Sequence, residues 1–164
     1  VIATLIRLDS KGSILFVQQR IGNDGRVFNM FKFRSMIRDA EAGTGPVWAT
    51  SEDPRQTRVG KWIRQYSLDE LPQLFNVLVG DMSIVGPRPE RAFFVNKFKE
   101  SVPKYMRRHM VKPGITGWAQ VNGLRGDTSV EERTRYDIYY IENWSLLLDL
   151  RILLRTLLAF KNAH

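Results

Sequence analysis

The sequence contains no cysteine and only two histidines, His109 and His164. The absence of cysteine excludes disulfide bonds, thiolate metal sites and cysteine nucleophiles. Neither histidine has a metal-ligand companion three or four residues away, which argues against a zinc site. A P-loop and a strand–GxGxxG–helix fingerprint are also missing, so neither of these phosphate-binding architectures is expected.

Acidic residues are scarce: 17 Asp and Glu stand against 25 Lys and Arg, for a net charge of +8. This balance predicts anionic partners but does not distinguish nucleic acid, acidic lipids and nucleotide phosphates. The chain also lacks the run of about 20 apolar residues that a membrane-spanning helix needs. The nearest candidate, Trp144 to Phe160, is interrupted by Asp149, Arg151 and Arg155, so we interpret it as a core or interfacial helix.

Two short strands are predicted near the N-terminus, Ile14–Gln18 and Val27–Phe33, joined by an Asp24–Gly25 turn signal. Residues 40–54 are rich in Gly, Thr, Ser and Pro and have no apolar period, which predicts a loop. Loops of that length often carry function.

Helical spacing dominates the rest of the chain. Helices are expected over Arg55–Tyr66, Leu71–Leu78, Glu90–Met110 with a break at Pro103, Ser129–Asn143, and from Trp144 onward. Ser83–Pro89 is predicted to be a proline-broken connector, and Lys112–Gly126 a turn-rich segment. Together with the 164-residue length, these patterns predict an α+β fold: one α-rich domain with a small β-hairpin or sheet and amphipathic interfacial helices.

The segment Ser67-Leu68-Asp69-Glu70 has two interpretations. A serine followed three residues later by glutamate is the capping-box pattern, in which both acids merely favour a helix N-terminus. However, cations recur just upstream at Arg55, Arg58, Lys61 and Arg64. A carboxylate among cations at a helix entrance suits Mg²⁺ binding or attack on a phosphorus atom.

Other basic segments also leave two interpretations open. The four upstream cations form either a phosphate-binding or membrane-contacting stripe, or a solvated helix face. Glu90–Met110 is either an interfacial membrane helix or an ordinary amphipathic helix whose aromatic residues face the core. Arg88 and Lys112 each lie in a proline-stiffened turn, which suits either a phosphate clamp or a purely structural turn.

Taken together, long motifs along nearly the whole chain resemble the bacterial sugar transferase family, the monotopic phosphoglycosyl transferases. The matching stretches are LDSKG with FVQQRIG (Leu8–Gly22), FKFRSM (Phe31–Met36), SLDELPQLFNVLVGDMSIVGPRP (Ser67–Pro89), KPGITGWAQVNG (Lys112–Gly123) and YDIYYIENWSLLLDLRILLRTL (Tyr136–Leu157). Several motifs in the family's order are far more specific than any single short pattern.

The resemblance implies a two-step covalent exchange. Asp69 would attack the β-phosphorus of a UDP-sugar, expel UMP and hold the sugar phosphate as an acyl phosphate. A polyprenyl (undecaprenyl) phosphate would then accept the group. Glu70 would assist with protons, and Asp69 and Glu70 would provide the environment for a Mg²⁺ cofactor.

Motif matching also implies a set of substrate-binding residues: Lys32, Arg64, Arg88, Lys112, Arg125 and Asp137. The sequence departs from the family at Arg125, which is displaced by one residue in NGLR, and at Lys112, where arginine is frequent. A lysine there exchanges a forked donor for a point charge. The family also carries a hydrophobic membrane segment before the LDSKG region. We therefore expect domain 1–164 to be a catalytic domain separated from an upstream anchor.

The implied partners are a UDP-sugar, polyprenyl phosphate and an anionic membrane surface, at the cytoplasmic face of the bacterial inner membrane. The implied process is the first membrane step of exopolysaccharide, capsule or O-antigen synthesis. NGLRGDTS favours the branch that transfers glucose or galactose phosphate, and homodimer formation is left open. Two alternatives are a basic nucleic-acid-binding module, for which no RNA- or DNA-binding signature is present, and a non-catalytic peripheral membrane adaptor.

Overall fold

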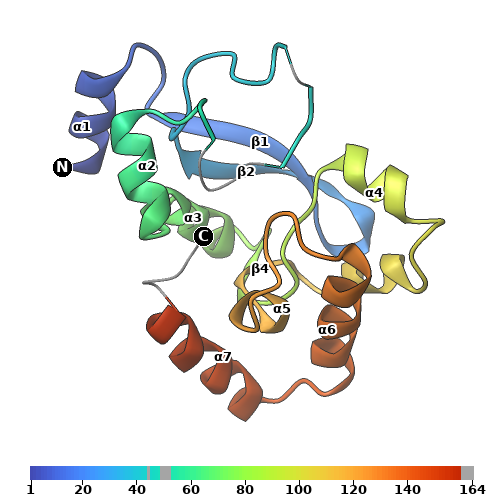
Figure 1. Ribbon diagram of the computed structural model, residues 1–164. Helices are drawn as coiled ribbons and strands as arrows, with labels where there is room; N and C mark the ends of the chain where they lie inside the picture. Colours follow the sequence, from blue (N-terminus) through green and yellow to red (C-terminus); the bar gives the residue numbers. More distant parts are fainter. Residues whose placement is uncertain (44, 49–52, 160–164) are drawn as a thin grey trace.

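The computed structural model describes residues 1–43, 45–48 and 53–159 (Figure 1). The α-helices are α1 (Ile2–Asp9), α2 (Arg58–Gln65), α3 (Gln73–Leu78), α4 (Ala92–Phe98), α5 (Trp118–Val121), α6 (Val130–Glu142) and α7 (Leu146–Ala159). The strands are β1 (Leu15–Ile21), β2 (Val27–Phe33), β3 (Ser83–Val85) and β4 (Gly114–Thr116). Short 3-10 turns are η1 (Asn23–Gly25), η2 (Leu68–Glu70) and η3 (Tyr105–His109). The predicted α+β class, rich in helix, is confirmed.

The N-terminal hairpin is confirmed. Strands β1 and β2 pair antiparallel along their whole length. Asp24 and Gly25 adopt left-handed φ angles of 53° and 74°, conformations that an Asp-Gly turn favours. The first strand continues to Ile21 instead of ending at Gln18.

Helix α1 is attached to the end of β2 by Arg34. The Arg34 guanidinium donates hydrogen bonds to the backbone carbonyls of Ser10 and Lys11, at 2.7 and 2.9 Å. Gly12 has a φ of 129°, and a Cβ there would meet Arg34 Nη1 at 2.1 Å. The arginine of FKFRSM and the glycine of LDSKG therefore have a structural reason to occur together.

Helix α3 is fixed to the open edge of β2 by Asn76, which is fully buried. Its amide oxygen accepts from the Phe31 backbone N–H at 3.1 Å, and its amide nitrogen donates to the Asn29 carbonyl at 2.7 Å. This side chain continues the sheet's hydrogen bonding across to a helix. The turn before α3 consequently lies beside Lys32.

The prediction of Ser83–Pro89 as a simple connector is wrong, because its first three residues form β3. Strand β3 pairs in parallel with β4, which lies inside the predicted turn-rich segment. The two backbones approach closely: a Cβ at Gly114 would lie 2.1 Å from the Gly86 nitrogen. Glycine here permits a strand contact that short-range patterns do not predict, since the partners are about thirty residues apart.

The C-terminal half packs on its own apolar cluster. Val85 of β3, Tyr140 of α6 and Ile152 of α7 are buried together. Figure 1 shows α7 below β4 and α6 beside it. The predicted C-terminal helix is present as α7, which begins at Leu146 instead of Trp144. No helix among the described residues is long and apolar enough to cross a bilayer.

The predicted helix Glu90–Met110 is divided into α4 and η3 around Pro103. Phe94 and Tyr105 are buried, whereas Phe93 and Met106 are about half exposed. The core-facing interpretation therefore holds for Phe94 and Tyr105. The membrane contact of this segment stays a prediction.

Candidate active site

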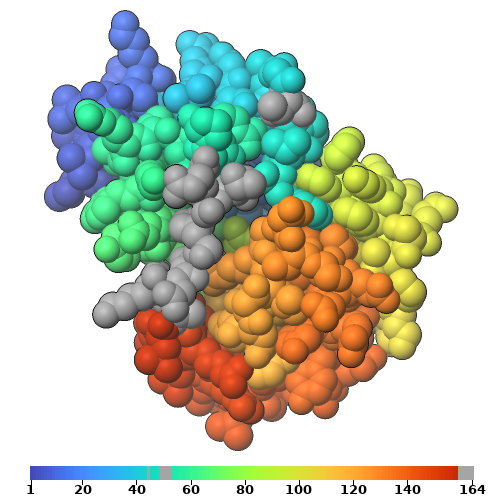
Figure 2. Space-filling view, viewed as in Figure 1, coloured from blue at the N-terminus to red at the C-terminus, as the bar shows by residue number. Residues whose placement is uncertain are grey.

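A pocket of about 1460 Å³ lies between the hairpin with α2 on one side and the α5–α6 region on the other. Figure 2 shows these two halves, blue to green and orange to red, meeting across the molecule. Most of the predicted site residues line the pocket: Lys32, Arg64, Asp69, Glu70, Arg88, Arg125 and Asp137. Segments distant in sequence thus converge on one cavity. Its volume exceeds that of ordinary small-molecule sites.

The predicted dyad lies in the tight connection between α2 and α3. Thr57 caps α2 by accepting from the Gly60 N–H at 2.9 Å, and the helix ends at Gln65. Ser67 then adopts a left-handed backbone with a φ of 52°, which reverses the chain into η2. This conformation is unusual for a residue other than glycine.

The capping-box interpretation is wrong. Ser67 makes no side-chain cap hydrogen bond, because its left-handed backbone is not that of an N-cap residue. The Glu70 carboxylate does not turn back toward Ser67 either. It points to cations on other segments, and the two acids of this turn have different environments.

Glu70 is held by two cations. Its Oε1 accepts from Lys32 Nζ at 2.7 Å, and both its oxygens accept from the Arg88 guanidinium, Oε2 from Nη1 at 3.2 Å and Oε1 from Nη2 at 2.5 Å. Burial acts to raise the pKa of Glu70, but Arg88 and Lys32 outweigh it and hold this pKa well below its ordinary value. Glu70 is therefore a carboxylate at neutral pH.

Asp69 is buried, with 5% of its surface exposed, yet no described residue donates a hydrogen bond to its carboxylate. Burial raises its pKa; the charge of Lys32 opposes this and the neighbouring Glu70 adds to it. A carboxylate with weak solvation and no hydrogen-bonded partner keeps its lone pairs available. Asp69 is thus a buried carboxylate without a hydrogen-bond donor among the described residues, whereas Glu70 is fixed by two cations.

Two arginines that line the pocket also lack an ion-pair partner among the described residues. Within the described ranges, neither Arg64 nor Arg125 forms an ion pair, and the buried Arg64 Nε has no hydrogen-bond partner. Arg64 is close enough to lower the pKa of Asp69. Arg125 lies close enough to Arg88 and Glu70 to be affected by both charges. Free guanidinium groups near a free carboxylate suit a phosphate-bearing ligand.

The cationic stripe predicted on α2 is divided in the structure. Arg58 and Lys61 are exposed, whereas Arg64 lines the pocket. Arg55 also lines it but binds Asp53, with Nε 2.8 Å from Oδ1. Only one end of the stripe therefore offers an uncommitted cation to the pocket.

Two predicted substrate residues are placed differently from expectation. Lys112 is exposed and does not line the pocket; its Nζ lies near Gly80. Asp137 lines the pocket, but its carboxylate accepts from Arg108 Nη2 at 2.7 Å, and both side chains are at least 96% buried. Asp137 is thus already paired.

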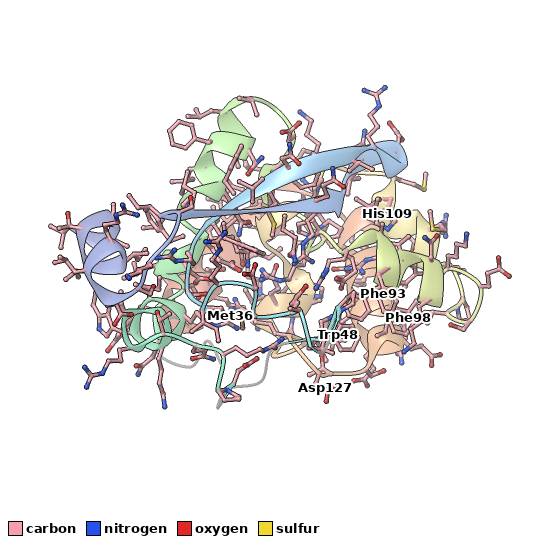
Figure 3. All side chains as sticks on the ribbon, turned by 90° about the horizontal axis from the view of Figure 1, so that it is seen from above. Met36, Trp48, Phe93, Phe98, His109 and Asp127 are labelled. Atoms are coloured by element: carbon pink, nitrogen blue, oxygen red, sulfur yellow. The ribbon has the colours of Figure 1, made fainter. Side chains whose placement is uncertain are left out.

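Sequence reasoning did not single out Arg20, Trp48 and Arg108, all of which line the pocket. Trp48 belongs to the predicted 40–54 loop and stacks on Phe94 of α4, with ring centroids 4.6 Å apart. Figure 3 shows Trp48 beside Phe98, which lies on α4 together with Phe94. The only sequence signal for Trp48 is the unusual length of the predicted loop that contains it. Arg108 is one of six lysines and arginines in Glu90–Met110, and no sequence pattern distinguishes it from the others.

The residues present fit a magnesium ion bound together with a substrate. The described residues contain no cluster of three or more carboxylate or histidine ligands. Mg²⁺ is commonly held by one or two carboxylates, substrate phosphates and water. Asp69 has a free carboxylate for such a site, and Glu70 adjoins it.

Comparison with known proteins shows the family of the chain. The family model described as bacterial sugar transferase matches residues 1–162. The chain belongs to this family. A UDP-glucose:undecaprenyl-phosphate glucose-1-phosphate transferase of Xanthomonas campestris pv. campestris is 52% identical over 94% of the chain and 33% of its own length.

Two further relatives support the same membership. A UDP-N-acetylgalactosamine-undecaprenyl-phosphate N-acetylgalactosaminephosphotransferase of Aeromonas hydrophila is 49% identical over 94% of the chain and 37% of its own length. The exopolysaccharide production protein PSS of Rhizobium leguminosarum bv. phaseoli is 43% identical over 96% of the chain and 82% of its own length. The chain thus spans about a third of the first two relatives and most of the third.

Proposed function

We propose that this sugar transferase domain moves a sugar 1-phosphate from a UDP-sugar to undecaprenyl phosphate through a covalent intermediate on Asp69. The supporting observation is the buried Asp69 carboxylate, which has no hydrogen-bonded partner and lines a pocket that also holds the uncommitted Arg64 and Arg125. The similar proteins of Xanthomonas and Aeromonas carry names that describe this type of transfer.

In the first step, an Asp69 oxygen attacks the β-phosphorus of the UDP-sugar. The bond between that phosphorus and the oxygen bridging it to the α-phosphorus breaks, and UMP leaves with the electron pair. In the second step, an oxygen of undecaprenyl phosphate attacks the same phosphorus and releases the Asp69 carboxylate. The product is an undecaprenyl diphosphate sugar, and Asp69 returns unchanged.

The cations of the pocket make an attack by one anion on another feasible. Phosphoryl transfer depends mainly on positioning and charge neutralisation. Arg64 and Arg125 would bind phosphate oxygens, while Lys32 and Arg88 neutralise Glu70 so that it does not repel the diphosphate. A Mg²⁺ held by Asp69 and the substrate phosphates, beside Glu70, would further neutralise the phosphate charge.

The membrane-facing part of this proposal concerns α7. Its buried side carries Ile152, whereas Leu147, Leu154 and Leu158 are 64–82% exposed. Fourteen residues span about 21 Å, less than the bilayer core of about 30 Å. An amphipathic helix of this kind suits the surface of the cytoplasmic leaflet, where undecaprenyl phosphate would be available.

The decisive experiment measures UMP release from a panel of UDP-sugars in the presence of Mg²⁺ and undecaprenyl phosphate. Mass spectrometry without the lipid acceptor should detect protein carrying one sugar phosphate. Asp69→Asn should remove both signals. Asp24→Asn is a matched control, because Asp24 lies exposed on the hairpin turn outside the pocket. Full UMP release by Asp69→Asn would refute the covalent mechanism.

Vesicle flotation tests the membrane contact separately. Leu154→Asp with Leu158→Asp should reduce binding to anionic vesicles at least about tenfold, since burying each leucine contributes roughly 1.5–3 kcal/mol. Val27→Asp is the control, because Val27 is also exposed but lies on the hairpin. Equal binding by the α7 variant and the wild type would exclude α7 as the membrane contact.

A further inference from the structure

Arg88, which holds Glu70, lies in the turn Pro87-Arg88-Pro89. All three backbone carbonyls of this turn accept hydrogen bonds from other segments. The Pro87 carbonyl accepts from the Gly114 N–H at 2.9 Å. The Arg88 carbonyl accepts from Arg108 Nη2 at 3.1 Å, and the Pro89 carbonyl accepts from Arg20 Nη1 at 3.2 Å. Two of the three donors are therefore arginine side chains.

Each of these arginines is fixed in turn by a carboxylate. Arg108 pairs with Asp137 at 2.7 Å in a setting where both side chains are almost inaccessible to solvent. Arg20 pairs with Glu90 at 3.2 Å, and both of these side chains are at most 16% exposed. In each arginine one terminal nitrogen, which carries two N–H groups, donates to both the carboxylate and the carbonyl: Nη2 of Arg108 and Nη1 of Arg20.

Prolines at both ends of the turn remove two N–H groups and fix two φ angles. The carbonyls are then the main means by which the rest of the protein can hold the turn. A displacement of about 1 Å in such a turn is enough to reduce catalysis about 100-fold.

We propose that Arg108 and Arg20 are positioning residues that clamp the Pro87–Pro89 turn and thereby hold the Arg88 guanidinium against Glu70. Asp137 and Glu90 orient the two clamping arginines. Asp137 then acts on the reaction through Arg108 and Arg88, and not by contact with the substrate. The kinetic consequence rests on the proposed function.

Arg108→Lys tests the clamp because lysine keeps the charge opposite Asp137, but its shorter side chain ends before the position from which Nη2 reaches both Asp137 and the Arg88 carbonyl. We expect kcat to fall about 10–100-fold, with KM for the UDP-sugar changed less than about threefold. Arg107→Lys is the matched control. Arg107 is the neighbouring residue, but it is half exposed and pairs with Glu142 at the surface. Unchanged turnover in Arg108→Lys would overturn the proposal.

A double-mutant cycle separates positioning from general destabilisation. If Arg108 acts through Arg88, Arg108→Lys should cost less than about twofold in an Arg88→Ala background, because coupled residues are not additive. Equal losses in both backgrounds would contradict the clamp. Arg20→Lys provides a second arm with the same expectation, through the Pro89 carbonyl, should Arg108→Lys fold poorly.

A measurement without substrate keeps this inference distinguishable from the proposed function. In the wild type, the side-chain N–H signals of Arg88 should be resolved in ¹⁵N NMR because Glu70 binds both terminal nitrogens. Arg108→Lys should broaden them, and Arg107→Lys should not. Sharp Arg88 signals in Arg108→Lys would refute the clamp. A wild type with these signals but without UMP release would instead count against the proposed function.

Discussion

Asp69 on η2 and Asp137 on α6 line the same pocket, and each exposes at most 5% of its surface. Their surroundings differ in one respect. Arg108 donates a hydrogen bond to Asp137 from within the core, whereas no described residue donates one to Asp69. The cations near Asp69, among them Lys32 and Arg64, influence it only through charge.

This difference shows that burial alone does not indicate a reactive carboxylate. A buried carboxylate in a hydrogen-bonded pair has its lone pairs occupied, and removing either partner leaves a buried unpaired charge. A buried carboxylate without such a partner is less stable but more available to a substrate. Asp137, the paired carboxylate, binds the arginine that supports the turn of Arg88. Asp69, the carboxylate without a hydrogen-bonded partner, lines the pocket.

The largest expected effect is on turnover. Asp69→Asn should reduce kcat for UMP release at least about 10⁴-fold, the scale on which loss of a nucleophile acts. Asp137→Asn should reduce it only about 10–100-fold, because Asp137 acts through Arg108. Rates are compared at a temperature where both variants are folded by circular dichroism. Losses of equal size would erase the distinction between the two carboxylates.

For stability, in contrast to turnover, Asp137→Asn is expected to be more harmful than Asp69→Asn. Asp137→Asn should lower the free energy of unfolding by about 3 kcal/mol or more, because the Arg108 charge stays buried without its counterion. Urea denaturation measures this loss. The double variant Arg108→Met with Asp137→Leu should cost less than Asp137→Asn alone, since it removes both charges. A larger loss in the double variant would contradict the pairing argument.

Asp69→Asn should affect stability in the direction opposite to Asp137→Asn. It should raise the free energy of unfolding by about 1 kcal/mol at pH 7, as substitutions at strained functional sites often do. Burial raises the folded-state pKa of Asp69, so ionisation costs stability as the pH rises through that value. The gain should therefore vanish below pH 3.8, the ordinary pKa. Thermal denaturation with a chelator present, at pH 7 and pH 3, checks both points. Destabilisation by Asp69→Asn at pH 7 would indicate a hidden partner.

The smallest effect is expected for a solvated pair. Glu142 and Arg107 are 3.1 Å apart, but both side chains are about half exposed. Glu142→Gln should change the free energy of unfolding by less than about 0.5 kcal/mol and leave UMP release unaffected. A change as large as that of Asp137→Asn would show that distance, and not burial, determines the strength of these pairs.

Motifs predicted which residues line the candidate site better than where each side chain points. Lys32, Arg64 and Arg88 line the pocket near Asp69 and Glu70; their roles stay predictions. Lys112 was named on the same grounds and lies outside the pocket. The difference arises because a motif match identifies a residue type in a segment, whereas the direction of its side chain depends on how that segment packs.

The sequence by itself determined the family, the α+β class, the Asp-Gly hairpin and the helices α6 and α7, because these depend on contiguous motifs and local periodicity. It could not determine which acid of Ser67–Glu70 is free. That choice depends on Lys32 and Arg88, which are separated from Glu70 by 38 and 18 residues. Nor could it reveal that Arg108 supports the Arg88 turn, since a buried hydrogen bond to a distant carbonyl leaves no periodic signal. Only the tertiary structure brings these groups within reach of one another.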